Sequence, residues 1–247
     1  TAGTMMANHM VKKLPKKDWK ITIVDQYKTH YYQPGFLFLP FDIYTKSQVK
    51  KNGKKFIPKG VDYIQKKIEL IVPEANKVEL ENGDSLSYDI LIVATGTKIA
   101  PEEIEGMSGP EWHKSIFDFY TVEGAVALQK FFKGWEGGKL VMAITELPYK
   151  CPVAPLEFVF LADADFTESG IRDKVDITYV TPMPGAFTKP IATKMLSQLL
   201  EEKNIKVIPE FYLESVDNEK KVIKSYDEQE IPFDVLTIVP VNMGSDM

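Results

Sequence analysis

Residues 76–96 read NKVELENGDSLSYDILIVATG, and this stretch decides the fold. An Asn-Gly pair at 82–83 lies between two alternating segments, which predicts a hairpin. The apolar run at 89–93 follows it and is typical of a parallel strand buried on both faces. The run ends in the small residues Ala-Thr-Gly at 94–96, and small residues at the carboxyl end of such a strand leave room for a ligand.

The same order of elements occurs a second time, at residues 220–240, KKVIKSYDEQEIPFDVLTIVP. A short strand, a polar turn and a second strand again precede an Asp and an apolar run. Val222 follows Val78 by 144 positions, and Ile208 follows Ile64 by the same interval (222 − 78 and 208 − 64). We infer a diverged internal duplication, whose two copies need not bind the same ligand.

The first copy opens with TAGTMMANHMVKKL at 1–14, where the apolar residues have helical spacing, and a short strand at 20–25 follows. Gly3 starts the helix, and Asp25 ends the strand 22 residues later (25 − 3). In dinucleotide-binding units a glycine-rich turn admits a pyrophosphate at the helix N-terminus, and an acidic residue about 20 positions on binds the ribose. A glycine that opens a helix also serves close packing, so both interpretations of Gly3 stand.

The second copy repeats this strand-loop-helix-strand order without a glycine fingerprint. We predict strands at 137–144 and 175–180 and helices at 155–170 and 190–203. Prolines, a lysine and Cys151 occupy the first turn, in the stretch PYKCPVAPLEF, where glycines would admit a phosphate. The predicted fold class is therefore α/β with two Rossmann-like, glutathione-reductase-like domains. The second domain lacks the glycine-rich turn that binds phosphate.

Composition limits the classes of function. The 247 residues are 44% hydrophobic and carry a net charge of −5, without a long basic block, which argues against a nucleic-acid partner. No stretch has the ~18 apolar residues of a membrane span. The single cysteine rules out an internal disulfide, and a reducing cytoplasm is the default compartment. No metal-ligand spacing is present, so we expect no metal site.

On these residues the chain resembles the two-dinucleotide-domain flavoproteins of the pyridine nucleotide-disulfide oxidoreductase superfamily. Within them it is most similar to the sulfide:quinone oxidoreductases and to the flavoprotein of flavocytochrome c sulfide dehydrogenase. The stretch KCPVAPLEF, in place of a second glycine fingerprint, is a specific signal, as is NMGSDM near the end. The other matching segments, in family order, are TAG, IVDQ, YYQPGF, LIVATGTKIAP and YVTPMPGAFTKP.

The resemblance implies FAD as the cofactor and a division into domains. Residues 1–112 would form the N-terminal part of the FAD domain, 113–230 the second Rossmann-like domain, and 231–247 a strand that returns to the FAD domain. The first strand and a C-terminal part would be missing, so we expect a fragment that is inactive alone. The cofactor-binding residues implied by the resemblance are Gly3, Asp25, Gln33, Pro34, Thr95 and Gly96.

The resemblance also implies that Cys151 is one of a redox-active pair beside the flavin. Sulfide would add to the pair, and electrons would pass through FAD to a quinone. Because the chain has no other cysteine, the partner thiol would lie beyond it. The nearby helix start and Lys150 both favour the thiolate, which is the nucleophilic form of cysteine. A small buried hydrophobe is the alternative interpretation of a lone cysteine.

The remaining expectations concern partners and proton transfer. Peripheral contact with the cell membrane would come from the missing C-terminal part, the compartment would otherwise be the cytoplasm, and a homo-oligomer is compatible with the sequence. His113 is a candidate for proton transfer. Glu157 either complements the dipole of the following helix or accepts a proton near the thiol.

Three rival functions remain. A flavocytochrome c-type sulfide dehydrogenase would keep the fold and the donor but pass electrons to a cytochrome. A degenerate, flavin-less scaffold would have no activity. A type II NADH:quinone dehydrogenase would need a glycine fingerprint in the second copy, which is absent, and the TPMPGAF segment at 181–187 offers no acidic side chain for a ribose.

Overall fold

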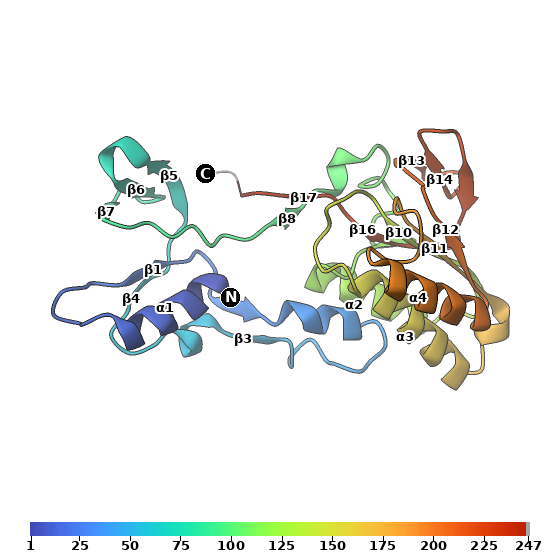
Figure 1. Ribbon diagram of the computed structural model, residues 1–247, viewed down its shortest axis with the longest axis horizontal. Coiled ribbons are helices and arrows are strands. Elements are labelled where there is room, and N and C mark those ends of the chain that lie inside the picture. Colours follow the sequence, from blue (N-terminus) through green and yellow to red (C-terminus); the bar gives the residue numbers. More distant parts are fainter. Residues whose placement is uncertain (246–247) are drawn as a thin grey trace. The chain divides into compact units, whose positions relative to one another are not determined.

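The computed structural model describes residues 1–245 and divides the chain into two compact units (Figure 1). The first unit comprises Thr1–Tyr32 and Ser47–Lys98, with the two described residues after Met243. The second unit comprises Gln33–Lys46 and Ile99–Met243. Each unit has its own sheets and its own buried side chains, and each is described separately below.

The first unit combines one helix with three small sheets. Helix α1 carries basic residues in its last turn, where they complement the helix dipole. Strands β1 and β4 are parallel, β2 and β3 are antiparallel, and β5, β6 and β7 form an antiparallel meander. The elements are α1 (Ala2–Lys13), β1 (Thr22–Val24), β2 (Thr29–Tyr31), β3 (Lys50–Asn52), η2 (Gly53–Phe56), β4 (Asp62–Ile64), β5 (Ile68–Val72), η3 (Pro73–Ala75), β6 (Lys77–Leu80), β7 (Ser85–Ser87) and β8 (Lys98–Ile99), which crosses the boundary between the units.

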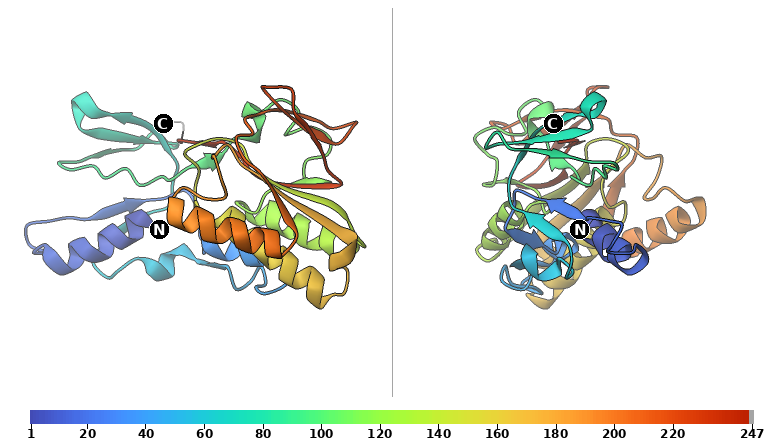
Figure 2. Two further views of the ribbon diagram at one scale, coloured as in Figure 1. Left: turned by 45° about the vertical axis from the view of Figure 1, so that its right-hand side comes forward. Right: turned by 90° about the vertical axis from the view of Figure 1, so that its left-hand side faces the viewer.

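The second unit is built on a parallel five-stranded sheet with the order β12-β11-β10-β16-β9. Helices α3 and α4 cover one face of this sheet, and the antiparallel sheet β13-β14-β15 lies on the other (Figure 2). The elements are η1 (Gln33–Phe38), η4 (Pro101–Glu103), β9 (Ile116–Phe117), α2 (Val122–Phe132), β10 (Gly138–Ile144), α3 (Ala154–Glu168), η5 (Arg172–Lys174), β11 (Val175–Val180), α4 (Pro190–Glu202), β12 (Ile205–Ile208), β13 (Leu213–Asp217), β14 (Val222–Ser225), β15 (Glu230–Pro232), β16 (Val235–Val239) and β17 (Asn242–Met243).

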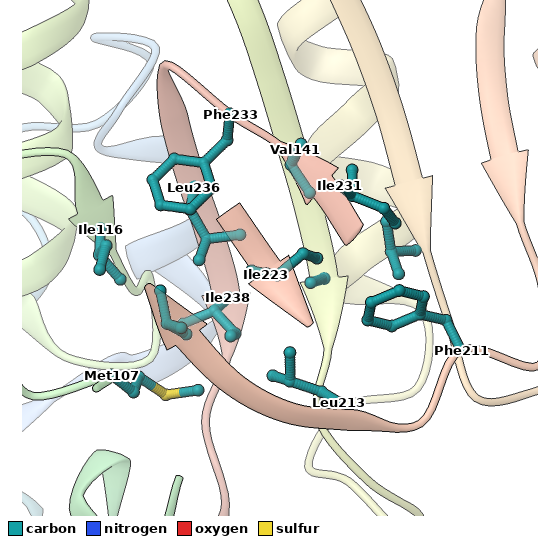
Figure 3. Close-up of a cluster of buried hydrophobic side chains, with 13 residues drawn as sticks. Met107, Ile116, Val141, Phe211, Leu213, Ile223, Ile231, Phe233, Leu236 and Ile238 are labelled. Carbon is teal, nitrogen blue, oxygen red and sulfur yellow. The ribbon is translucent and has the colours of Figure 1, made fainter. Parts of the chain in front are cut away.

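The core of the second unit lies between these two sheets. Alternate residues of β10 and β16 point toward the β13-β14-β15 sheet, where they meet Phe211, Ile223 and Phe233 (Figure 3). Every residue of β16 is buried, as expected for a strand with a parallel neighbour on each side. The apolar runs at 138–144 and 235–239 therefore become the central strands of this sheet.

The internal duplication is visible in the folded chain. Strands β6 and β14, which contain Val78 and Val222, are each the middle strand of a three-stranded antiparallel sheet. Strands β4 and β12 precede these sheets and end at Ile64 and Ile208. The interval of 144 residues thus relates structurally equivalent positions in the two units.

One predicted strand does not form. Residues 89–93 lie outside every strand, and Ile90 and Val93 keep 66% and 58% of their surface exposed. The equivalent run in the second copy forms β16 between β10 and β9, whereas no strand of the described residues pairs with 89–93. The prediction of a buried strand here was wrong. The pattern of apolar residues indicates which side chains can be buried, but burial also requires neighbouring strands that pair with the segment.

The two units also differ in extent from the predicted domains 1–112, 113–230 and 231–247. Gln33–Lys46 lies in the second unit, as does Ile99–Met243. Strand β16, predicted to return to the first domain, pairs with β10 and β9 in the second unit's sheet. The last two residues of the predicted segment, 246–247, lie outside the described residues.

Candidate active site

Cys151 lies in the loop between β10 and α3, with an exposed free thiol. Its φ of 60° places it in the left-handed region, which costs a non-glycine residue roughly 1–2 kcal/mol. The Cys151 carbonyl accepts a hydrogen bond from the Ala154 N–H at 3.1 Å, at the point where α3 begins. No side chain caps this helix start, and the Leu156 and Glu157 N–H groups donate to the Val153 carbonyl instead. The positive end of the α3 dipole therefore lies directly after the turn that carries the thiol.

Lys150 links this turn to a distant segment. Its Nζ donates a hydrogen bond of 2.6 Å to Oε1 of Gln33, the first residue of η1. Burial lowers the pKa of the half-buried Lys150 ammonium, while the negative charge of a Cys151 thiolate raises it.

Two tyrosines complete the surroundings of Cys151, and the sequence analysis identified neither. Tyr120 Oη donates to the Lys150 carbonyl at 2.8 Å, and Tyr149 Oη donates to the Pro152 carbonyl at 3.0 Å. Burial, followed by the charge of Cys151, raises the pKa of Tyr120 far above its usual range and that of Tyr149 to about 12. Both phenols therefore remain protonated donors at neutral pH.

The sequence offered two candidates for proton transfer, His113 and Glu157, and their surroundings differ from each other. His113 Nε2 lies 3.1 Å from Oδ2 of Asp118, a fully buried residue that accepts hydrogen bonds from the backbone N–H groups of Tyr120 and Thr121 before α2. His113 thus belongs to the network that starts this helix. Glu157 lies exposed in the first turn of α3.

Four of the predicted cofactor-binding residues lie in the first unit: Gly3, Asp25, Thr95 and Gly96. Gly3 is in the first turn of α1, where a Cβ would lie 3.5 Å from the Ala94 Cβ, so the helix start lies beside the Ala-Thr-Gly segment. This first turn has no acidic residue and no capping side chain. An exposed, uncapped helix start is a suitable site for a phosphate group.

The two strand-end positions are also accessible. Asp25 is exposed just after β1, and its Oδ1 accepts a hydrogen bond from the Tyr27 N–H at 2.9 Å. Thr95 and Gly96 are exposed, and Gly96 has a φ of 73° that favours glycine. The residues present in the first unit are thus compatible with the adenine-dinucleotide part of FAD.

Gln33, Pro34 and Cys151 belong to the second unit. Gln33 and Pro34 are exposed at the start of η1, whereas the next residues, Gly35 to Leu37, are buried. The segment Gln33–Phe38 therefore forms a 3₁₀ helix that is anchored by its apolar side chains. It presents its first two residues in the same unit as the thiol.

No helix among residues 1–245 has the length and apolar character needed to cross a bilayer. Within the same residues, no group of three or more His, Cys, Asp or Glu side chains is arranged to hold a metal ion.

Comparisons with known proteins identify relatives along nearly the whole chain. It is 25% identical over 251 aligned residues to the mitochondrial sulfide:quinone oxidoreductase of Mus musculus, covering 99% of this chain and 55% of that protein. It is also 25% identical to the mitochondrial sulfide:quinone oxidoreductase of Dictyostelium discoideum, over 82% of this chain and 45% of that protein. The chain therefore spans about half the length of these curated relatives. No family model matches it.

The fold has a close counterpart among solved structures. The sulfide:quinone oxidoreductase of Aquifex aeolicus superimposes with a TM-score of 0.82 at 22% identity, covering 98% of this chain and 57% of that one. The predicted α/β fold with two Rossmann-like units and the predicted resemblance to the sulfide:quinone oxidoreductase family are both confirmed.

Proposed function

We propose that this chain is part of an FAD-dependent enzyme that oxidises sulfide to zero-valent sulfur or polysulfide and passes the electrons to a quinone. Cys151 is its redox-active thiol. The observation that carries this proposal is the exposed, left-handed Cys151 turn at the uncapped start of α3. A left-handed non-glycine residue at a functional position is a common form of stored backbone strain. The names of the relatives supply the donor and the acceptor.

In the proposed enzyme, residues of this chain would hold FAD. The uncapped N-terminus of α1 at Gly3 would bind the pyrophosphate, Asp25 would accept hydrogen bonds from the ribose hydroxyls, and Thr95 and Gly96 would leave room for the cofactor. Gln33 and Pro34 would contact the cofactor near the flavin. Bound FAD accepts a pair of electrons and can release them singly, as a sulfide donor and a quinone acceptor require.

The chemistry of the protein's own residues centres on sulfur. Hydrosulfide loses two electrons and one proton when it becomes zero-valent sulfur, and the quinone is the proposed final acceptor of the electrons. The Cys151 thiolate is the proposed nucleophile toward a persulfide RSSH: attack on the outer sulfur forms a Cys151 persulfide, breaks the S–S bond and releases RS⁻. Lys150, which donates a hydrogen bond to Gln33, precedes Cys151 directly, and α3 begins three residues after it. Tyr120 and Tyr149, both protonated, hold the turn through the Lys150 and Pro152 carbonyls.

The proposed partners are sulfide and a quinone, and we place the enzyme in the cytoplasm or peripherally at a membrane. Two other functions fit the same fold, and the tests separate them. A flavocytochrome c-type enzyme would reduce a cytochrome rather than a quinone. A flavin-less scaffold would give a colourless full-length preparation, whereas the proposed enzyme shows the visible absorption bands of flavin.

The decisive variant is Cys151→Ala in the full-length protein. We expect sulfide-dependent quinone reduction to fall on the order of 10²-fold or more, as for other groups that act in the chemical step. The flavin absorption should remain, because the residues proposed for the dinucleotide are unchanged. Near-normal turnover with retained flavin would show that Cys151 is not the redox-active thiol.

A further inference from the structure

Helix α4 carries an exposed apolar stripe. The helix packs on β12, the edge strand of the parallel sheet, and Leu200 is the one residue of α4 that is fully buried (Figure 1). On the opposite side, Ile191, Met195 and Leu199 keep 81%, 66% and 44% of their surface exposed. Because these three residues recur at every fourth position, they lie on one side of the helix. Three large apolar side chains gathered in this way differ from the scattered exposure that is normal on a protein surface.

The charges at the two ends of α4 oppose the dipole of the helix. Lys189 is the N-cap residue, its side chain makes no capping hydrogen bond, and the first turn has no acidic residue. The last turn has no basic residue and ends in Glu201 and Glu202. Lys203, which follows, donates its hydrogen bond to Asp163 of α3. Acidic groups stabilise the start of a helix and basic groups its end, so the order in α4 is unfavourable for the helix alone.

A second copy of α4, placed antiparallel, complements both the stripe and the charges. With the Met195 residues of the two copies opposite each other, Ile191 of one copy lies opposite Leu199 of the other, since they stand four positions on either side (195 − 4 and 195 + 4). Glu202 then lies beside the uncapped start of the second helix and its Lys189. The stripe therefore matches itself, as a two-fold interface requires, and each acidic end meets a basic end.

We propose that this face of α4 is a docking surface for a second copy of the chain, in an antiparallel pair of helices centred on Met195. The terminal charges select this arrangement over a parallel one, in which Lys189 would meet Lys189 and Glu202 would meet Glu202. One helix pair is small compared with the roughly 1,200–2,000 Å² of a stable interface, so the dimer should form at chain concentrations on the order of 10⁻⁵–10⁻⁴ M. Dimerisation through α4 would not depend on the proposed redox function.

Sedimentation velocity of the 247-residue protein over a range of concentrations measures the association. We expect Met195→Lys to raise the dissociation constant of the dimer about tenfold or more, because it places two ammonium groups at the centre of an apolar contact. Tyr226→Lys is the matched control, since Tyr226 is 71% exposed between β14 and β15 and lies outside the stripe. A wild-type protein that stays monomeric up to about 10⁻³ M would overturn the proposal.

Charge reversal tests the pairing of the helix ends. Lys189→Glu and Glu202→Lys should each weaken dimerisation by about threefold to tenfold, because each brings like charges together. The double variant Lys189→Glu/Glu202→Lys makes the charges opposite again and should recover most of the affinity, which is a non-additive effect. A double variant as weak as the single ones would contradict the antiparallel arrangement.

Cross-linking through an introduced cysteine gives an independent measurement of the register. In a Cys151→Ala background, Met195→Cys should form an intermolecular disulfide readily, because position 195 lies opposite itself. Ile191→Cys and Leu199→Cys should cross-link far more slowly. The two copies of either residue stand eight positions apart (199 − 191), about 12 Å along the helix, whereas a disulfide spans Cα atoms no more than about 7 Å apart. Equal cross-linking at all three positions would indicate a parallel or non-specific contact and would overturn the proposal.

Two other occupants of the stripe would give different results. If a lipid surface covers it, wild type sediments with phosphatidylglycerol vesicles, Met195→Lys does not, and the protein alone stays monomeric. If another part of the full-length protein covers it, that protein is monomeric and shields Met195→Cys from a maleimide. Either result would overturn docking of a second copy. Failure of the proposed function is a separate result, since it appears as turnover by the full-length Cys151→Ala enzyme.

Discussion

The left-handed backbone at Cys151 is the residue-scale feature on which the proposed chemistry depends. Such a conformation persists only where surrounding contacts determine it, and here hydrogen bonds from Tyr120, Tyr149 and Ala154 act on the carbonyls of residues 150–152. Cys151 is exposed in this conformation. By contrast, α3 begins three residues later with buried side chains. Cys151 is therefore exposed and is not a small buried hydrophobe, and its reactivity stays a prediction.

Tyr149 gives a prediction about high pH. Burial and the nearby Cys151 raise its pKa from 10.0 to about 12, so the folded protein holds the phenol proton more tightly than the unfolded chain does. This contribution to stability is fully present below pH 10 and is lost as the pH rises toward 12. We expect Tyr149→Phe to lose less free energy of unfolding than wild type does between pH 10 and about pH 12. Urea unfolding at each pH measures this free energy. The exposed Tyr226→Phe is the control, and equal pH profiles for Tyr149→Phe and wild type would contradict the assignment.

The sequence identified Cys151 because the family pattern surrounds it, but it did not identify Tyr120. Only the folded chain brings Tyr120 Oη to the Lys150 carbonyl, across 30 residues. Gln33 was expected near the flavin, and its contact with Lys150 spans 117 residues. Contacts of this kind follow from packing, which no local spacing records. Tyr149, two residues before Cys151, is the one neighbour that a closer examination of the motif would have found.

At the scale of elements, the spacing of apolar residues correctly predicted the helices and strands that pack against other elements of the described chain. Helices α1, α3 and α4 and strands β10 and β11 form within a few residues of their predicted bounds. The runs at 89–93 and 235–239 have similar apolar patterns, yet only the second becomes a strand. A pattern of apolar residues therefore predicts a buried strand only on the condition that flanking strands pair with it.

Asp163 of α3 gives a prediction about the packing of elements. Its carboxylate accepts hydrogen bonds from Arg172 Nε at 2.8 Å and Lys203 Nζ at 2.6 Å, which tie α3 to η5 and to the end of α4. We expect Asp163→Asn to lower the free energy of unfolding by about 1–3 kcal/mol, because two partly buried cations lose their partner. Urea denaturation at pH 7 measures the change, with Asp176→Asn on β11 as an exposed control.

The pH dependence of this cluster has a definite sign. Burial acts to raise the pKa of Asp163, but the hydrogen bonds and charges of Lys203 and Arg172 outweigh it and hold the pKa below its usual value of 3.8. A lowered folded-state pKa contributes stability that is present above pH 3.8 and is lost as the pH falls below it. The difference between wild type and Asp163→Asn should therefore shrink in acid. A constant difference from pH 7 to pH 3 would contradict this account.

At the scale of the whole molecule, the buried apolar side chains are divided unequally between the two units. Those of the first unit are few among the described residues: Ala7, Val49, Val78 and Leu80. The second unit has a continuous core between its sheets and the aromatic cluster around Phe158. Since regions with little apolar burial open more readily, the first unit should be the less stable part of the chain.

Hydrogen exchange followed by mass spectrometry can test the difference in stability between the two units together with the proposed cofactor site. Without ligand, amides of β1, β4 and residues 89–98 should exchange much faster than those of β10, β11 and β16. A ligand that binds only the folded state stabilises it, so added FAD should slow exchange around Gly3, Asp25 and Thr95 and leave β11 unchanged.

Gly3→Asp places a carboxylate at the uncapped start of α1, where it should repel the pyrophosphate and abolish the protection. Protection that persists in Gly3→Asp, or exchange that is unaffected by FAD in the wild-type chain, would contradict the proposed dinucleotide site.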